Sequence, residues 1–166
     1  MTAAASRPMQ SNERTVVTRV FDAPRALVFK AWTEPKHLAQ WWGPQGFTNP
    51  VCEVDVRPGG AIRIVMRGPD GVEYPMRGTF REVSEAERLV FTAVAEDAQG
   101  NRLLEAVTTV TFAEQGGKTK LTLHARAVAL VAAAAPMLEG MQAGWTQSLE
   151  RLDALVASGD QPAMPG

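Results

Sequence analysis

The sequence has few of the residues that disulfides, metal sites and nucleophilic catalysis require. It contains one cysteine, Cys52, and two histidines, His37 and His124. A single cysteine excludes a disulfide within the chain, and a zinc site needs convergent ligands that no spacing here supplies. We therefore expect no bound metal and no cofactor. An apolar core must hold the fold together.

Long apolar runs and a surplus of one charge are also missing. No stretch approaches the ~20 apolar residues of a membrane helix, and Met1 to Glu13 has no apolar region typical of a secretory signal. The formal net charge is -1, and the lysines and arginines are scattered along the chain. These absences predict a cytoplasmic protein that binds neither nucleic acid nor membrane.

The size of the chain suits a single domain. At 166 residues it can bury roughly 70% of its unfolded surface. We place the domain at residues 14–158. Residues 1–13 and 159–166 show no apolar period, so we expect them to be disordered tails.

The hydrophobic period changes near the beginning of this domain. Residues 14–21 are rich in valine and threonine and predict a strand. Asp22 can cap a following helix that accepts Pro24 in its first turn, and helical spacing continues to Trp32. Pro35 then suits the beginning of a second short helix, at 35–40.

From Phe47 onward the period becomes two, which predicts half-buried strands. Strands are expected near 53–57, 62–67, 74–81, 89–96, 103–112 and 118–127. Glycine-rich and polar turns separate them, and connections this short make neighbouring strands antiparallel. The side chains expected on the dry face are Cys52, Val54, Val56, Ile62, Ile64, Met66, Tyr74, Met76, Phe80, Phe91, Thr108, Val110, Leu121 and Leu123. Glu53, Asp55, Glu105 and His124 are expected on the wet face.

The end of the chain predicts one long helix, residues 137–157, that covers the dry face. Its apolar stripe follows steps of three and four: Leu138, Met141, Trp145, Leu149, Leu152 and Leu155. Gly140 and Gly144 leave one edge of this helix almost bare. Either the edge packs closely against a backbone, or it leaves room for a ligand between helix and sheet.

These elements and several short motifs together resemble the START-like superfamily called SRPBCC. The motifs are Asp22-Ala23-Pro24, Trp32-Thr33-Glu34-Pro35, Trp41-Trp42-Gly43-Pro44, Pro58-Gly59-Gly60 and Gly144-Trp145. Within the superfamily, the sequence is similar to single-domain proteins related to the C-terminal domain of the activator of heat-shock protein 90 ATPase. The resemblance implies an α+β helix-grip fold. In this fold a curved antiparallel sheet of about seven strands wraps around a long C-terminal helix, and two short helices follow the first strand.

The resemblance leaves the function open, because such proteins include a co-chaperone domain, presumed small-molecule binders, cyclases and lipid carriers. On the dry face only Tyr74 and Thr108 carry hydrogen-bonding groups, and neither has an evident base beside it. Cys52 is expected to be a small buried thiol rather than a nucleophile. Trp41 and Trp42 either seal the core or form part of a lid, residues 42–47, over a cavity.

The sequence favours a binding protein for a small, largely apolar molecule held between sheet and helix, with Tyr74 and Thr108 as orienting groups. The side chains expected to line the cavity are Trp42, Ile64, Met66, Tyr74, Met76, Phe80, Phe91, Thr108, Met141, Gly144, Trp145 and Leu149. A protein-interaction or co-chaperone-like domain is the first alternative. A cyclase- or hydrolase-type enzyme is the second, and an inward Glu105 or His124 would favour it. A homodimer and a protein partner are both compatible with the sequence.

Overall fold

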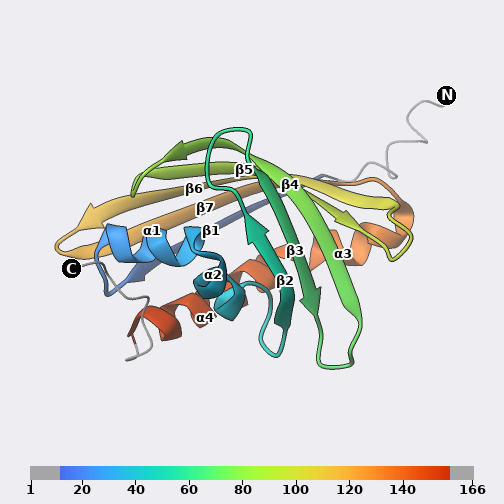
Figure 1. The fold of residues 1–166 in the computed structure, drawn as a ribbon, viewed down its shortest axis with the longest axis horizontal. Helices are drawn as coiled ribbons and strands as arrows, with labels where there is room; N and C mark the ends of the chain where they lie inside the picture. Colours follow the sequence, from blue (N-terminus) through green and yellow to red (C-terminus); the bar gives the residue numbers. More distant parts are fainter. Residues whose placement is uncertain (1–11, 158–166) are drawn as a thin grey trace.

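The computed structural model describes residues 12–157, which form one seven-stranded antiparallel sheet and a set of helices (Figure 1). The strand order is β1-β7-β6-β5-β4-β3-β2. The strands are β1 (Asn12–Phe21), β2 (Thr48–Val54), β3 (Ala61–Arg67), β4 (Glu73–Ser84), β5 (Arg88–Glu96), β6 (Arg102–Gln115) and β7 (Lys118–Ala129). The helices are α1 (Arg25–Thr33), α2 (Pro35–Trp41), the 3-10 turn η2 (Ala132–Ala134), α3 (Ala135–Glu139) and α4 (Met141–Ala157). The predicted α+β fold, with two short helices after the first strand, is confirmed.

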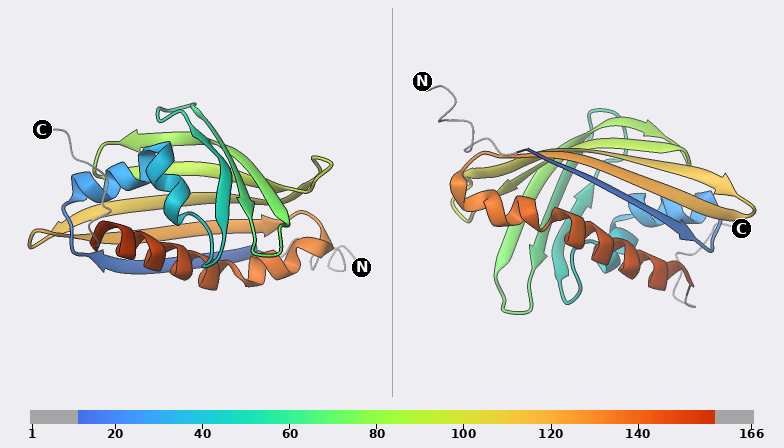
Figure 2. Two further views of the ribbon diagram at one scale, coloured as in Figure 1. Left: turned by 60° about the horizontal axis from the view of Figure 1, so that its bottom comes forward. Right: turned by 180° about the vertical axis from the view of Figure 1, so that it is seen from behind.

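The sheet is strongly curved, and the helices lie on its concave side. Figure 2 shows α4 running across this face, with the strands arched over it. Alternation along β7 explains the arrangement: Leu121, Leu123 and Ala125 are fully buried, while Arg126 between Ala125 and Ala127 is exposed. One face of the sheet therefore packs on the helices and the other faces solvent.

The buried residues form two clusters of unequal size. The larger cluster joins α1, α2 and the C-terminal part of α4 to the sheet and contains all the buried aromatic side chains of the described chain. The smaller cluster lies under η2 and α3 and consists mostly of alanines, with Leu104 and Leu138. Met141, at the beginning of α4, packs against both clusters.

The predicted helix at 137–157 is wrong in one respect, because two helices occupy this stretch. The short helix α3 ends at Gly140, whose N–H donates to the Pro136 carbonyl at 3.0 Å, and α4 begins at Met141. Glycine has no Cβ to favour helical backbone, so a break at this position is inexpensive. The helix over the sheet is therefore 17 residues long, about 25 Å at 1.5 Å per residue.

The predicted cap of the first helix is also wrong. The N-cap of α1 is Pro24, and no side chain caps this end. The Pro24 carbonyl accepts hydrogen bonds from Leu27 and Val28, which leaves Asp22 two residues too early to reach the same N–H groups.

The boundaries of other elements differ by a few residues from those expected. Strand β1 includes Asn12 and Glu13, which pair with Val128 and Ala127 near the end of β7, and β7 itself ends at Ala129, two residues beyond the expected end. The rest of the two expected tails, residues 1–11 and 158–166, lies outside the described residues.

Candidate ligand-binding site

All four tryptophans of the chain meet between the helices and the sheet. Trp32 of α1 lies at the centre: its ring centroid is 4.6 Å from that of Trp41, 6.4 Å from Trp42 and 6.0 Å from Trp145 of α4. Trp32 also contacts Phe91 of β5, at 6.3 Å. Trp41 is fully buried, so it seals the core, whereas Trp42 and Trp145 are half-buried. This tryptophan cluster lies between the helices and the sheet, in the region where the sequence predicts a cavity.

A small apolar void lies beside the tryptophan cluster. Its volume is about 10 Å³, roughly that of a single water position. Apolar side chains line it: Trp32, Leu38, Trp42, Val54, Ile62, Ile64, Phe80, Leu89 and Phe91. Trp42, Ile64, Phe80 and Phe91 were among the predicted lining residues. Trp32 was missed, because its helical spacing indicated only a core position.

Trp32 carries a buried polar atom without a partner. Its indole Nε1–H has no hydrogen-bond acceptor among the described residues, whereas the same group of Trp41 donates to the Ala31 carbonyl at 3.0 Å. A buried donor left unpaired costs about 1–3 kcal/mol. Thr15, fully buried on β1, likewise has a side-chain oxygen without a partner in this part of the chain.

The bare edge of α4 borders open space. A Cβ built on Gly144 would meet no atom of another element within 4 Å, so close packing does not require glycine at this position. The neighbouring Met141 and Trp145 are partly exposed, as is Met76 on β4. Close packing is therefore not the reason for glycine at position 144, and room for a ligand between helix and sheet stays a prediction.

The two predicted orienting residues do not converge. Thr108 is only 2% exposed and lies opposite Phe91 in the sheet, while Tyr74 is 36% exposed and packs against Phe47 with ring centroids 5.8 Å apart. Phe91 pairs with Phe80, and Tyr74 is six residues from Phe80 along β4, about 20 Å at 3.3 Å per residue. One small molecule cannot be held by both groups at a single polar atom. Leu149, another predicted lining residue, is fully buried in the core.

Arg151 of α4 binds the segment that follows α2. Its Nη1 donates to the carbonyls of Trp42, Gly43 and Pro44 at 3.1, 2.9 and 3.0 Å, and its Nη2 donates to the Gln40 carbonyl at 2.9 Å. Burial lowers the pKa of the Arg151 guanidinium from its ordinary value. The last carbonyls of a helix have no partner within it, and at the end of α2 the charged Arg151 side chain supplies the missing donor.

Two further side chains of α4 hold the same segment. The Ser148 hydroxyl accepts a hydrogen bond from the Gly43 N–H at 3.1 Å, and the Gln147 side-chain oxygen accepts one from the Gln45 N–H at 3.0 Å. Together with Arg151 they fasten residues 42–45, which include the void-lining Trp42, to α4. We call these three side chains the latch. No pattern in the sequence indicates the latch, because it depends on two segments that lie more than 100 residues apart.

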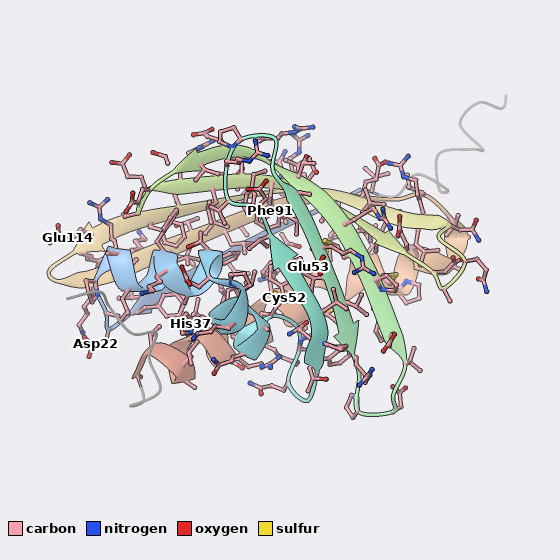
Figure 3. The ribbon with its side chains drawn as sticks, in the orientation of Figure 1. Asp22, His37, Cys52, Glu53, Phe91 and Glu114 are labelled. Atoms are coloured by element: carbon pink, nitrogen blue, oxygen red, sulfur yellow. The ribbon has the colours of Figure 1, made fainter. Side chains whose placement is uncertain are left out.

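The ionisable groups do not gather at this site. His37 lies on α2, where burial lowers its pKa and the nearby Glu34 opposes that shift. Burial and then Glu53 raise the pKa of Cys52 to about 11. Figure 3 shows Asp22 and Glu114 at one end of the molecule, away from Cys52. Within residues 12–157, no group of three or more His, Cys, Asp or Glu side chains could hold a metal ion.

The other acidic and basic candidates lie as predicted on the outer face. Glu105 lies between two buried residues of β6, and His124 lies between two buried residues of β7. Both side chains therefore point to the outer face of the sheet. None of the described helices has the length and apolar character needed to cross a membrane.

A curved antiparallel sheet closed over a C-terminal helix, with an apolar interior, defines a helix-grip protein. Residues 22–157 match the family model described as Activator of Hsp90 ATPase homolog 1-like protein. The chain belongs to this family, and the predicted resemblance is confirmed.

Solved structures agree with this assignment. A protein from Chromobacterium violaceum is 31% identical with a TM-score of 0.75, and the match covers 88% of this chain and 98% of that one. The AHSA1 protein from Silicibacter pomeroyi is 27% identical with a TM-score of 0.72, covering 89% and 98%. A protein from Nitrosomonas europaea is 27% identical with a TM-score of 0.69, covering 87% and 94%. A comparison with curated proteins gives no match.

Proposed function

We propose that this protein binds a small, largely apolar molecule between the sheet and α4, in the reducing cytoplasm. The observation that carries the proposal is the tryptophan cluster, with an apolar void beside it and an unpaired Nε1–H on Trp32. A core selected only for stability would pair this donor, as it pairs that of Trp41. The unpaired Cys52 thiol suits a reducing compartment.

The chemistry of the site limits the class of molecule that it could bind. The lining is apolar, and Trp32, which is part of it, carries a buried unpaired donor, so we expect a molecule with an apolar body and one hydrogen-bond acceptor, such as a carbonyl or ether oxygen. Trp32, rather than Tyr74 or Thr108, would orient it.

Binding requires the interior to open. Ligand pockets occupy roughly 300–1,000 Å³, far more than the void of about 10 Å³. The latched segment beginning at Trp42 is the element that can move with little loss of core, because Trp42 is only half-buried while Trp41 is fully buried. We assign this segment the role of a lid, and the latch holds it closed.

A protein-interaction role is the second candidate. Val72 and Tyr74, at the β3–β4 hairpin, are 48% and 36% exposed, and Val16 and Val20 on the edge strand β1 are 48% and 43% exposed. These side chains form two separate groups rather than one continuous apolar patch on the surface of the described chain. A protein partner is therefore less well supported than a ligand in the interior.

The experiment is native mass spectrometry of the full chain purified from its own host, followed by titration with 6-propionyl-2-(dimethylamino)naphthalene, a neutral apolar probe whose ketone oxygen can accept a hydrogen bond. We expect a small-molecule adduct that is lost on denaturation, and a saturable change in tryptophan emission. Trp32→Phe should weaken probe binding by about three- to tenfold, the effect of one lost hydrogen bond. Trp41→Phe is the matched control: it should lower stability and leave the affinity of the folded protein unchanged. A bare protein mass together with unchanged emission would overturn the proposal.

A further inference from the structure

The outer face of the sheet carries a groove that the interior site does not explain. Its volume is about 820 Å³ and it crosses five strands, from β1 through β7, β6 and β5 to β4. Its central side chains are Thr92 and Val94 of β5 and Val107 of β6. Arg126 lies between the buried Ala125 and Ala127, which places the groove on the face opposite the tryptophan cluster.

Arginines dominate the rim of this groove. Arg14, Arg81, Arg102 and Arg126 line it, against only two acidic residues, Glu13 and Glu105. Arg102 is paired with Glu105. Arg14, Arg81 and Arg126 form no ion pair with any described residue, and all three are exposed. We call these three arginines, together with the central side chains Thr92, Val94 and Val107, the arginine groove.

Elsewhere on the outer face, arginines are neutralised by glutamates. Arg63 pairs with Glu53 at 3.9 Å, and Arg67 pairs with Glu73 at 2.6 Å. Further pairs join Arg77 to Glu96 at 3.3 Å and Arg88 to Glu82 at 3.1 Å. The unpaired arginines are thus concentrated in the groove rather than spread over the sheet.

Two of these arginines are placed against each other. Arg14 of β1 lies directly opposite Arg126 of β7, and like charges in this position destabilise an antiparallel pair. Arg63 and Arg77 also face each other across β3 and β4, but each has its own glutamate. The Arg14–Arg126 pair has no such compensation from the described residues. An anion bound between the two would supply it.

We propose that the arginine groove binds a small molecule through a phosphate or carboxylate group held between Arg14 and Arg126, which face each other. Arg81, on β4 and about 14 Å from β7 across three strand spacings, would meet a second polar group of the same molecule. Guanidinium groups match both oxyanions in planar, two-point hydrogen bonding. The volume suits a small molecule, and Val94 and Val107 offer its remaining atoms an apolar floor. This site is independent of the interior site, since it lies on the other face of the sheet.

The test is an amide NMR titration of the full chain with inorganic pyrophosphate and, separately, with citrate, at constant ionic strength. We expect saturable shifts at Val94, Val107 and Val128 with at least one of the two anions. Saturation by pyrophosphate alone indicates a phosphate ligand, and saturation by citrate alone indicates a carboxylate ligand. Arg126→Gln should weaken this binding by about tenfold or more, because it removes charge-assisted hydrogen bonds.

Arg88→Gln is the matched control, since Arg88 lies on the same face, is paired with Glu82 and does not line the groove. It should leave the affinity unchanged. At low salt and without anion, Arg126→Gln should have a Tm no lower than that of the wild type. The substitution removes the repulsion between Arg14 and Arg126, and this gain offsets the loss of the arginine's other contacts. Shifts that do not saturate, that chloride reproduces, or that Arg88→Gln reduces as much as Arg126→Gln would overturn the proposal.

Discussion

Arg151 donates hydrogen bonds to four backbone carbonyls at and after the end of α2, so its substitution tests directly whether the latch holds residues 42–45. Arg151→Met keeps the apolar stem and removes the donors, so we expect a loss of about 1.5–3 kcal/mol, or roughly 3–12 °C in Tm. Calorimetry checks this, with Glu150→Gln, an exposed neighbour on α4, as the control. Equal Tm values for the two variants would show that the latch does not hold the segment.

Cys52 should be a poorly reactive thiol. Burial is the main reason that its pKa rises from an ordinary value of 9.0 to about 11, so at pH 8 the thiolate fraction is about a hundredfold smaller than for a free cysteine. Ellman's reagent should therefore react slowly with the native protein at pH 8, and faster as the pH rises toward 11 or when the protein is unfolded. Reaction of native protein at the rate of a small free thiol would contradict the raised pKa of this partly buried side chain.

Single residues also show what the sequence could and could not predict. Alternation placed Cys52, Phe91 and Thr108 on the inner face, because a strand must present every second side chain to the same side. It could not show that Trp32 lacks a hydrogen-bond acceptor or that Arg151 reaches the end of α2. Both depend on atoms that come together only when distant segments pack. The same limit hid the separation of Tyr74 from Thr108.

At the scale of elements, α4 owes its open edge to Gly144. Gly144→Ala places a methyl group where no atom of another element lies within 4 Å, and glycine costs a helix about 1 kcal/mol relative to alanine. We expect the variant to be more stable by about 0.5–1 kcal/mol in denaturant titrations. Gly78→Ala on β4 is the contrast: its Cβ would lie 1.8 Å from the Thr92 carbonyl oxygen, so it should destabilise by about 1–3 kcal/mol. A destabilised Gly144→Ala would mean that the edge is packed after all.

The two helix errors have a common origin. Helical spacing runs without interruption from Leu138 to Leu155, so periodicity alone joins α3 to α4, and it does not register that Gly140 ends one helix. Similarly, an aspartate shortly before a proline is a pattern typical of helix caps. In the structure, however, Pro24 itself is the N-cap, and its carbonyl accepts hydrogen bonds from the first turn of α1. Periodicity identifies which face is buried more reliably than it identifies where a helix begins.

At the scale of the whole molecule, every described element lies within residues 12–157, and the family match covers 22–157. We predict that a chain limited to 12–157 unfolds in one cooperative transition, with a Tm within about 4 °C of the full chain, a change on the order of 1 kcal/mol. Differential scanning calorimetry of both chains checks this. A larger drop, or two separate transitions, would contradict a single domain bounded near these residues.

The central claim, an apolar ligand held under the sheet, is tested most directly by the ligand-induced rise in Tm of Met76→Trp. Met76 lies on the inner face directly opposite Ile64, which lines the void, and is only partly buried. An indole at this position should therefore extend into the ligand's space at little cost to the fold. A ligand at 100 times its Kd stabilises the wild type by about 2.7 kcal/mol, which raises its Tm.

We predict that Met76→Trp has a Tm near that of the wild type without ligand, and that ligand no longer raises it. Leu152→Ala, which empties a fully buried position, should lose about 2–5 kcal/mol and keep the rise. The claim would be contradicted if Met76→Trp were destabilised as much as Leu152→Ala and no apolar compound raised the wild-type Tm.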